Sequence, residues 1–269
     1  MIAGSLERLL REEIALKSKR RLAGEERQRV REREDDEVVG VICALQKCPA
    51  IIDDPVDPRT GAYFSASGQL AARTLGSEVG FAKSFFTAQF FRPVSSARRL
   101  VIAGDARLGF AAGFPRDVIL VDAAGHSVVG TVKDLPQSER FFAGGDTTVR
   151  GFALDRLGVR HSPAQSNDTI DKDGFPIGGN GLVVVNAELR APVKWGVTAV
   201  GFVDAGNVFA RATDINLAEL RAATGFGVRY KSPIGPLRFD WGFKLHRDEI
   251  APGVREGRME FWVSFGQAF

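Results

Sequence analysis

From about residue 61 onward, apolar and polar side chains alternate with a period of two, and this rhythm constrains the fold more than any other feature. In residues 237–246 the odd positions carry Leu, Phe, Trp, Phe and Leu, whereas the even positions carry Arg, Asp, Gly, Lys and His. Residues 183–191 and 100–110 repeat the pattern. Because successive side chains of a β-strand point to opposite faces, these runs predict strands with one apolar face and one polar face.

The alternating runs predict an all-β fold, an antiparallel meander of about eight strands. They lie near residues 62–75, 79–93, 97–113, 181–193, 196–209, 221–232, 235–246 and 257–269. Most connections are short, but the segment from about 115 to 179 is long and rich in Gly, Asp and Pro. Structureless loops of that length are uncommon in compact domains and usually functional, so this one is a candidate functional element.

The first part of the chain follows a different pattern. Residues 5–37 are dense in Arg, Lys and Glu, and the apolar residues Leu6, Leu9, Leu10 and Ile14 lie near helical spacing. Residues 53–61, with three aspartates and two prolines, then supply turn chemistry. We therefore expect a charged helical or irregular segment at 1–52 and a sheet domain at 53–269.

Composition excludes several function classes. The 36 Lys and Arg residues nearly balance the 33 Asp and Glu residues, so nothing indicates a nucleic-acid partner. No run approaches the roughly 18 apolar residues of a membrane-spanning helix, and Met1 is not followed by the basic and apolar regions of a signal peptide. The cysteines and histidines lack the spacing of a metal or redox site, and no catalytic motif is present: Cys43, Cys48, His126, His161 and His246. We expect no metal, no cofactor and no enzymatic activity.

Alternation alone also fits a soluble β-sandwich or a lipocalin-like barrel. Two features favour a transmembrane barrel: charged residues recur on the polar face of successive strands, and aromatic residues gather at strand ends. The final strand points the same way. It places Phe261, Val263, Phe265 and Phe269 on one face, with Gly266 on the other.

A motif in the long segment carries a family resemblance. Residues 140–152 read Arg-Phe-Phe-Ala-Gly-Gly-Asp-Thr-Thr-Val-Arg-Gly-Phe, and three further segments follow in order: 201–207, 232–240 and 261–269. Together they resemble the BamA/TamA outer-membrane insertase superfamily, also called bacterial surface antigen proteins, over about residues 53–269. The resemblance implies the C-terminal half of a transmembrane β-barrel.

The same resemblance implies roles for individual residues. The long loop would fold back into the barrel, and Arg150 at its tip would pair with Asp204 on the wall; the tip would also comprise Gly144, Gly145, Val149, Gly151 and Phe152. The residues alone leave another reading open, in which Arg150 is a solvated loop charge and Asp204 caps a turn. Likewise Phe261, Val263, Phe265, Gly266 and Phe269 would form a C-terminal assembly signal, or those aromatic residues would only face lipid.

The implied function is that of an outer-membrane protein assembly and insertion factor in the cell outer membrane of a Gram-negative bacterium. Its implied partners are the lipid bilayer, unfolded outer-membrane or secreted polypeptides, the barrel-assembly machinery, or a chain that supplies missing strands. Because the family's periplasmic domains and first barrel strands have no counterpart in this sequence, we expect a truncated copy. The alternatives are a polypeptide-secretion pore of the two-partner type, a passive porin and an inactive fragment.

Overall fold

The computed structural model describes residues 50–269 except 55, 74–76, 78, 96–98, 122–126, 133–134, 161–167, 233–234, 252–253, 267 and 269. The charged helix expected before residue 50 therefore lies outside the described residues. The chain divides into two units, residues 1–42 with 71–79 and residues 43–70 with 80–269. Within the described part of the smaller unit, the amide of Ser77 donates to the carbonyl of Ala72 at 3.4 Å. The larger unit carries the sheet.

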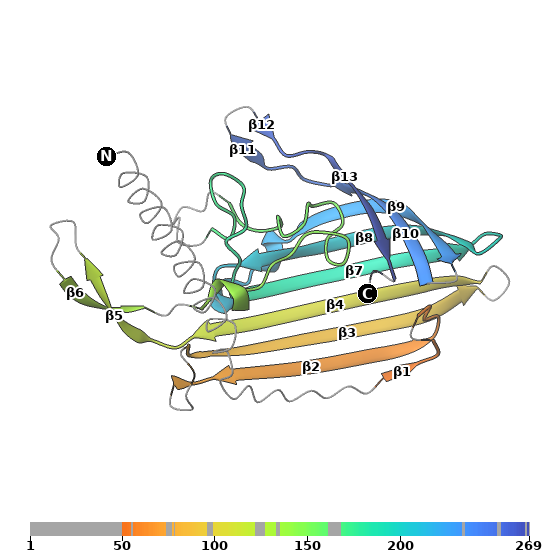
Figure 1. Ribbon diagram of the computed structural model, residues 1–269. Coiled ribbons are helices and arrows are strands. Elements are labelled where there is room, and N and C mark those ends of the chain that lie inside the picture. The colour runs from red at the N-terminus through yellow and green to blue at the C-terminus, as the bar shows by residue number, and fades with distance from the viewer. Residues whose placement is uncertain are drawn as a thin grey trace, which may run out of the picture. The chain divides into compact units, whose positions relative to one another are not determined.

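The larger unit is built on one antiparallel meander (Figure 1). Its strand order is β1-β2-β3-β4-β7-β8-β9-β10-β13. The bounds are β1 (Ala50–Ile52), β2 (Gly61–Ala71), β3 (Phe81–Ser95), β4 (Leu100–Gly113), β7 (Gly181–Pro192), β8 (Val197–Phe209), β9 (Arg221–Ser232), β10 (Gly235–Lys244) and β13 (Met259–Phe265). The eight long strands match the predicted runs, so the predicted all-β meander is confirmed.

Most strand boundaries differ by a few residues from those expected, and three of the differences change the reading. Ala50–Ile52 pairs with Gly61–Tyr63 of β2, so the sheet begins before the expected boundary at residue 53. β2 ends at Ala71 instead of residue 75. β13 ends at Phe265, because Gly266 adopts a φ of 90°, which breaks the extended backbone, and it therefore does not lie on a strand face.

The long segment after β4 is not loop throughout. It begins with a hairpin of β5 (Arg116–Val121) and β6 (Ser127–Val132), which projects beyond the main sheet in Figure 1. Both strands are rich in β-branched and aliphatic residues that favour strands, a feature the expected uniform loop at 115–179 overlooked. A second hairpin, β11 (Glu249–Ala251) with β12 (Val254–Arg255), lies between β10 and β13. Short 3-10 helices occur at η2 (Gln137–Glu139), η4 (Ala212–Asp214) and η5 (Leu217–Glu219).

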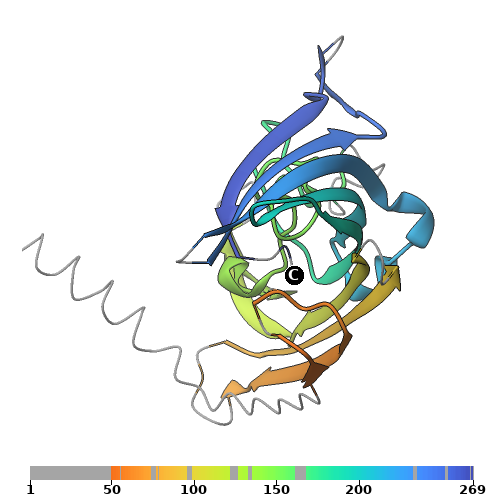
Figure 2. The same cartoon turned by 90° about the vertical axis from the view of Figure 1, so that its right-hand side faces the viewer.

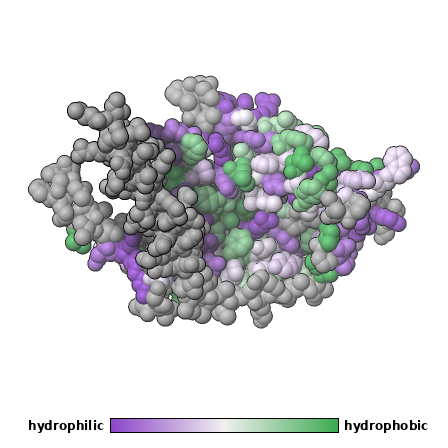
Figure 3. Space-filling model, viewed as in Figure 1, coloured by the Kyte–Doolittle hydropathy of each residue, from purple (hydrophilic) through white to green (hydrophobic). Residues whose placement is uncertain are grey.

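The two faces of the sheet are inverted relative to a soluble protein. On β7, Asn186, Glu188 and Arg190 are 2–4% exposed, whereas Val185 and Leu189, at the alternate positions, are 45% and 47% exposed. Other strands expose large apolar side chains in the same way, and hydrophobic residues reach the surface on the face shown in Figure 3. A soluble sandwich would bury the apolar face, so this arrangement excludes it.

Curvature explains how the polar face becomes buried. Viewed along the strands, the sheet of the larger unit curves around the segment that follows β6 (Figure 2). We call the concave side of the sheet the inner face and residues 144–152 the loop tip. Six loop-tip residues are buried: Gly144, Gly145, Val149, Arg150, Gly151 and Phe152. The long segment thus fills the space that the polar side chains face.

Candidate functional site

Charged side chains gather on the inner face, where β7 to β10 run side by side. All of them are less than 5% exposed, and they include three acids and three arginines. We call this group the inner charge cluster: Glu188 and Arg190 on β7, Asp204 on β8, Arg229 on β9, and Arg238 and Asp240 on β10. Buried charges are costly unless they are paired, so the contacts of this group decide whether it can be stable.

Arg150 of the loop tip binds Asp204 through three hydrogen bonds. Its Nε donates to Asp204 Oδ2 at 2.8 Å and its Nη2 to Oδ1 at 2.7 Å, a parallel two-bond geometry between guanidinium and carboxylate. The backbone amide of Arg150 also donates to Oδ2 at 3.1 Å. Both side chains are at most 1% exposed, so this pair is buried. The structure thus brings together the two residues that the family resemblance paired.

Further contacts surround the guanidinium of Arg150. Its Nη1 donates to Glu188, and its Cζ lies 3.5 Å from the ring centroid of Phe202. Burial alone would lower the pKa of Arg150, but the hydrogen bonds and charge of Asp204, with the charges of Glu188 and Asp240, outweigh it and raise the pKa above its ordinary value. Arg150 therefore stays cationic.

The arginines of the inner charge cluster pair with Glu188 and Asp240. Arg229 binds Glu188 at 2.6 Å and reaches Asp240 at 3.3 Å, which links β9 to both neighbouring acids. Arg190 contacts Glu188 at 2.9 Å, and Arg238 contacts Asp240 at 3.1 Å. Each acid of the cluster therefore has at least two cationic or amide partners, as buried carboxylates require.

The loop tip is also held through its main chain. Four strand side chains each donate to a different carbonyl of residues 146–150: Arg238 to Asp146 at 2.6 Å, Arg107 to Thr147 at 2.9 Å, Asn186 to Thr148 at 2.5 Å and Trp262 to Arg150 at 2.9 Å. These donors come from β10, β4, β7 and β13. Because the contacts are to backbone atoms, they fix the path of the tip rather than read its side chains.

The other residues of the motif shape the tip. Gly144 and Gly145 both have a φ of 109°, a conformation that residues with a Cβ rarely adopt. The amide of Gly145 donates to the carbonyl of Phe152 at 2.9 Å, which closes the turn. Val149 and Phe152 are buried, and the ring of Phe152 lies below the cations of Arg221 and Lys244, at 4.5 and 5.1 Å.

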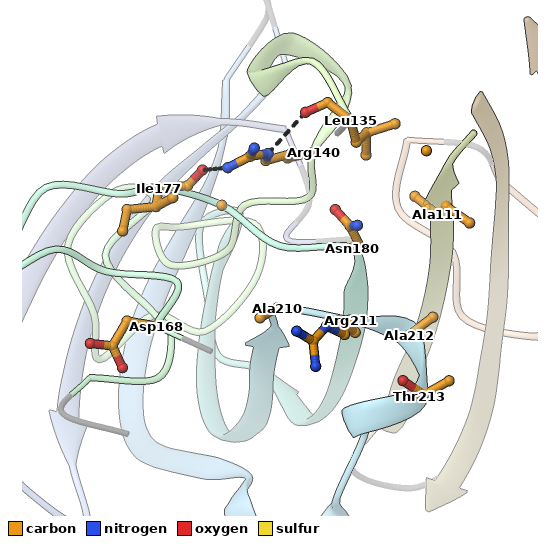
Figure 4. Close-up of a pocket in the computed structure, with 13 residues that line it drawn as sticks. Ala111, Leu135, Arg140, Asp168, Ile177, Asn180, Ala210, Arg211, Ala212 and Thr213 are labelled. Carbon is orange, nitrogen blue, oxygen red and sulfur yellow. Dashed lines mark hydrogen bonds between the residues drawn. The ribbon is translucent and has the colours of Figure 1, made fainter. Parts of the chain in front are cut away.

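Arg140, the first residue of the motif, ties the base of the loop. Its Nε donates to the carbonyl of Leu135 at 3.1 Å and its Nη1 to the carbonyl of Ile177 at 3.3 Å, as Figure 4 shows. Leu135 lies near the beginning and Ile177 near the end of the segment that connects β6 to β7. Arg140 thereby closes the loop beside a cavity of about 480 Å³ that is also lined by Asn180 and Arg211.

The terminal strand places its apolar residues outward. Phe261, Val263 and Phe265 are 47%, 55% and 66% exposed, so they share one face as expected. Phe269 lies outside the described residues. Among the described residues no group of His, Cys, Asp and Glu could hold a metal ion. None of the helices in this same part of the chain is long and apolar enough to cross a membrane.

Sequence reasoning identified Arg150 and Asp204 but missed most of their neighbours. Glu188, Arg229 and Asp240 all occupy polar positions of alternating strands, which was the available indication. Trp262 was missed because it lies among the apolar residues of the last strand, where its place on the polar face did not distinguish it from the other aromatic residues. Alternation tells on which face a side chain lies, but not which partner on that face it reaches.

These features define the class. An antiparallel meander with an apolar outer face, a charged inner face and a loop held on that inner face is the architecture of a membrane β-barrel wall. The particular family follows from comparison. The model of the Omp85 superfamily domain matches residues 50–269, and the chain belongs to that superfamily. The expected C-terminal barrel portion of the BamA/TamA superfamily is thereby confirmed.

Several relatives are similar to this chain. The outer membrane protein assembly factor BamA of Nitratidesulfovibrio vulgaris is 28% identical over 221 residues, which is 81% of this chain and 24% of that protein. BamA of Neisseria meningitidis serogroup B is 26% identical over 230 residues, 74% of this chain and 26% of that protein. The chloroplastic outer envelope protein 80 of Arabidopsis thaliana is 31% identical over 150 residues, 53% of this chain and 17% of that protein.

A solved structure shares the fold. The crystal structure of BamA from Haemophilus ducreyi lacking POTRA domains 1–3 matches with a TM-score of 0.58 at 23% identity, covering 80% of this chain and 40% of that one. The chain thus spans about a quarter of the length of the two BamA relatives.

Proposed function

We propose that this chain forms the C-terminal barrel wall of a factor that inserts proteins into the cell outer membrane of a Gram-negative bacterium. The observation that carries the proposal is the buried contact of Arg150 with Asp204, at 2.7 and 2.8 Å, within a sheet whose outer face is apolar. That contact holds the loop tip on the inner face of the sheet, and the similarity to two outer membrane protein assembly factors supports the proposal.

The mechanism we propose involves no covalent chemistry. β13 stands at the end of the strand order, paired with β10 on one side. An edge strand offers backbone N–H and C=O groups on which an extended segment of an unfolded outer-membrane protein can pair. The lipid bilayer would meet the apolar outer face. The barrel-assembly machinery, or a chain that supplies further strands, would be additional partners.

We further propose that the outward residues Phe261, Val263 and Phe265, with Phe269, serve as the signal by which assembly machinery recognises this barrel. The common face and the exposure of Phe261, Val263 and Phe265 support a side-chain readout in register with strand pairing. Deletion of Phe269 should lower the amount of protein that reaches the outer membrane. Unchanged insertion would show that these residues only face lipid.

The function is tested by reconstituting the protein in liposomes and adding an urea-unfolded outer-membrane protein. We expect the wild type to increase the protease-resistant fraction of that substrate, and Arg150→Ala and Asp204→Ala to abolish most of the increase. Arg156→Ala is the matched control, because Arg156 lies beside Phe175 at 5.6 Å and not on the wall. If both variants keep wild-type insertion but change polypeptide passage or ion conductance, the protein is a secretion pore or a porin instead.

A further inference from the structure

The edge strand β13 touches the loop tip through one aromatic side chain. Trp262 lies opposite Asp240 of β10 in the strand register, on the inner face, whereas its neighbours Phe261 and Val263 point outward. Its indole Nε1 donates to the carbonyl of Arg150 at 2.9 Å. The residue whose guanidinium binds Asp204 is therefore also held, through its carbonyl, by the last strand of the sheet.

Gly242 makes this contact possible. It is adjacent to Asp240 along the inner face of β10, and a Cβ at this position would lie 2.4 Å from the carbonyl oxygen of Arg150 and 2.8 Å from the amide nitrogen of Gly151. The missing side chain lets the main chain of the loop tip lie directly against the sheet. The carbonyl of Arg150 is thereby placed within reach of the indole from the neighbouring strand.

The chemistry of the contact is directional. An indole N–H is a donor with no acceptor capacity, and the carbonyl of Arg150 is a buried acceptor that needs a partner. The other tip carbonyls accept from β10, β4 and β7, which have strand neighbours on both sides. Trp262 differs from these donors because β13 pairs with a neighbouring strand on one side only within the described sheet. Its contact with the loop tip therefore stabilises a strand that has fewer backbone hydrogen bonds.

We propose that Trp262 is a positioning residue that fastens edge strand β13 to the loop tip, so that release of the tip loosens the strand on which a substrate segment pairs. Only the second part of this inference, that a substrate segment pairs on β13, rests on the proposed function. The latch itself, Trp262 to the carbonyl of Arg150, is a property of this chain whatever its substrate.

The test compares Trp262→Phe with Trp241→Phe in the full chain reconstituted in lipid nanodiscs. Phenylalanine keeps most of the ring volume and removes the N–H, so a role in packing alone predicts no effect. Trp241 is the matched control for ring packing, because it lies on the outer face of β10, stacked on Phe226 at 5.4 Å, and its ring also contacts Phe261 of β13 at 4.9 Å. The readout is amide hydrogen exchange of β13, residues 259–265.

We expect Trp262→Phe to speed exchange of β13 by roughly 3- to 10-fold, the range that loss of one hydrogen bond gives, and Trp241→Phe to leave it unchanged. Trp262→His, which retains a ring N–H, should restore part of the protection. Gly242→Ala disturbs the same contact by displacing the loop tip from β10, and it should also speed exchange of β13 while leaving Trp262 intact.

Two results separate the latch from the function. If Trp262→Phe and Gly242→Ala both leave β13 exchange at the wild-type rate, the latch is wrong. If β13 exchange rises but liposome insertion of the unfolded substrate does not change, the latch stands and pairing at this edge is not how the protein acts. If insertion changes together with β13 exchange, Trp262 controls the strand that receives the substrate.

Discussion

The contact between Arg150 and Asp204 can be tested energetically by a double-mutant cycle. The perturbations are Arg150→Ala, Asp204→Ala and the pair together, and the quantity compared is the free energy of undocking the loop tip from the inner face. The two side chains are at most 1% exposed and share two guanidinium hydrogen bonds, so little solvent screening weakens their interaction.

The expected magnitude follows from what each variant leaves behind. Removing one partner of a buried ion pair costs about 3–5 kcal/mol. Here the lower end applies, because Asp204 keeps Asn186 at 2.8 Å and Glu188 keeps Arg229 at 2.6 Å after Arg150 is lost. We expect about 3 kcal/mol for each single variant and a coupling of about 2 kcal/mol between them, since contacting residues are not additive.

The assay is native-state hydrogen exchange of residues 144–152 in nanodiscs, which gives the free energy of local opening. Arg156→Ala serves as the control for loss of a loop arginine. A coupling below about 0.5 kcal/mol, the level found for independent sites, would refute the reasoning. Arg150 would then be a loop charge that happens to lie near Asp204, and the position of the loop would depend on its main-chain contacts.

Three further predictions concern other contacts. Gly242→Ala should weaken loop-tip docking by about 1–3 kcal/mol, because the new Cβ would overlap the Arg150 carbonyl. Gly201→Ala is the control and should have no effect, because no atom lies within 4 Å of the Cβ added there. Equal hydrogen exchange of the loop tip in the two variants would contradict the prediction. Val203→Arg, on the outer face of β8, should destabilise the folded chain in lipid by about 2–4 kcal/mol, measured by urea unfolding in vesicles, and a neutral result would mean that this face does not meet lipid. Burial would raise the pKa of Glu256, but the hydrogen bonds and charge of Arg221 outweigh it and lower the pKa below the ordinary value of 4.5. The stabilising contribution of Glu256 is therefore present above pH 4.5 and is lost as the pH falls through the lowered pKa. Hydrogen exchange of residues 254–258 should show this loss in the wild type and not in Glu256→Gln.

The strands could be predicted closely because a period of two is a local property of the sequence. On β10 the even positions Arg238 and Asp240 were expected on the polar face, and both are buried on the inner face. Ends were less predictable, since they depend on single residues. Gly266 ends β13 through its backbone conformation, which alternation alone does not reveal.

The inner charge cluster was predictable only in part. Arg150 and Asp204 are separated by 54 residues, so no local pattern links them, and only the resemblance of the motif suggested the pair. Glu188 and Arg229 meet across the intervening strand β8. Such a contact depends on sheet curvature and on the reach of a long side chain, and the alternation of apolar and polar residues predicts neither.

The site joins the loop to several strands through a single residue. Arg150 uses its amide and guanidinium on Asp204 of β8, its Nη1 on Glu188 of β7 and its carbonyl on Trp262 of β13. These bonds are directional, so one placement of the tip satisfies them together, whereas an apolar tip could slide on the sheet. A shift of any of these strands must therefore break a contact of Arg150, and the loop tip becomes sensitive to the arrangement of the strands around it.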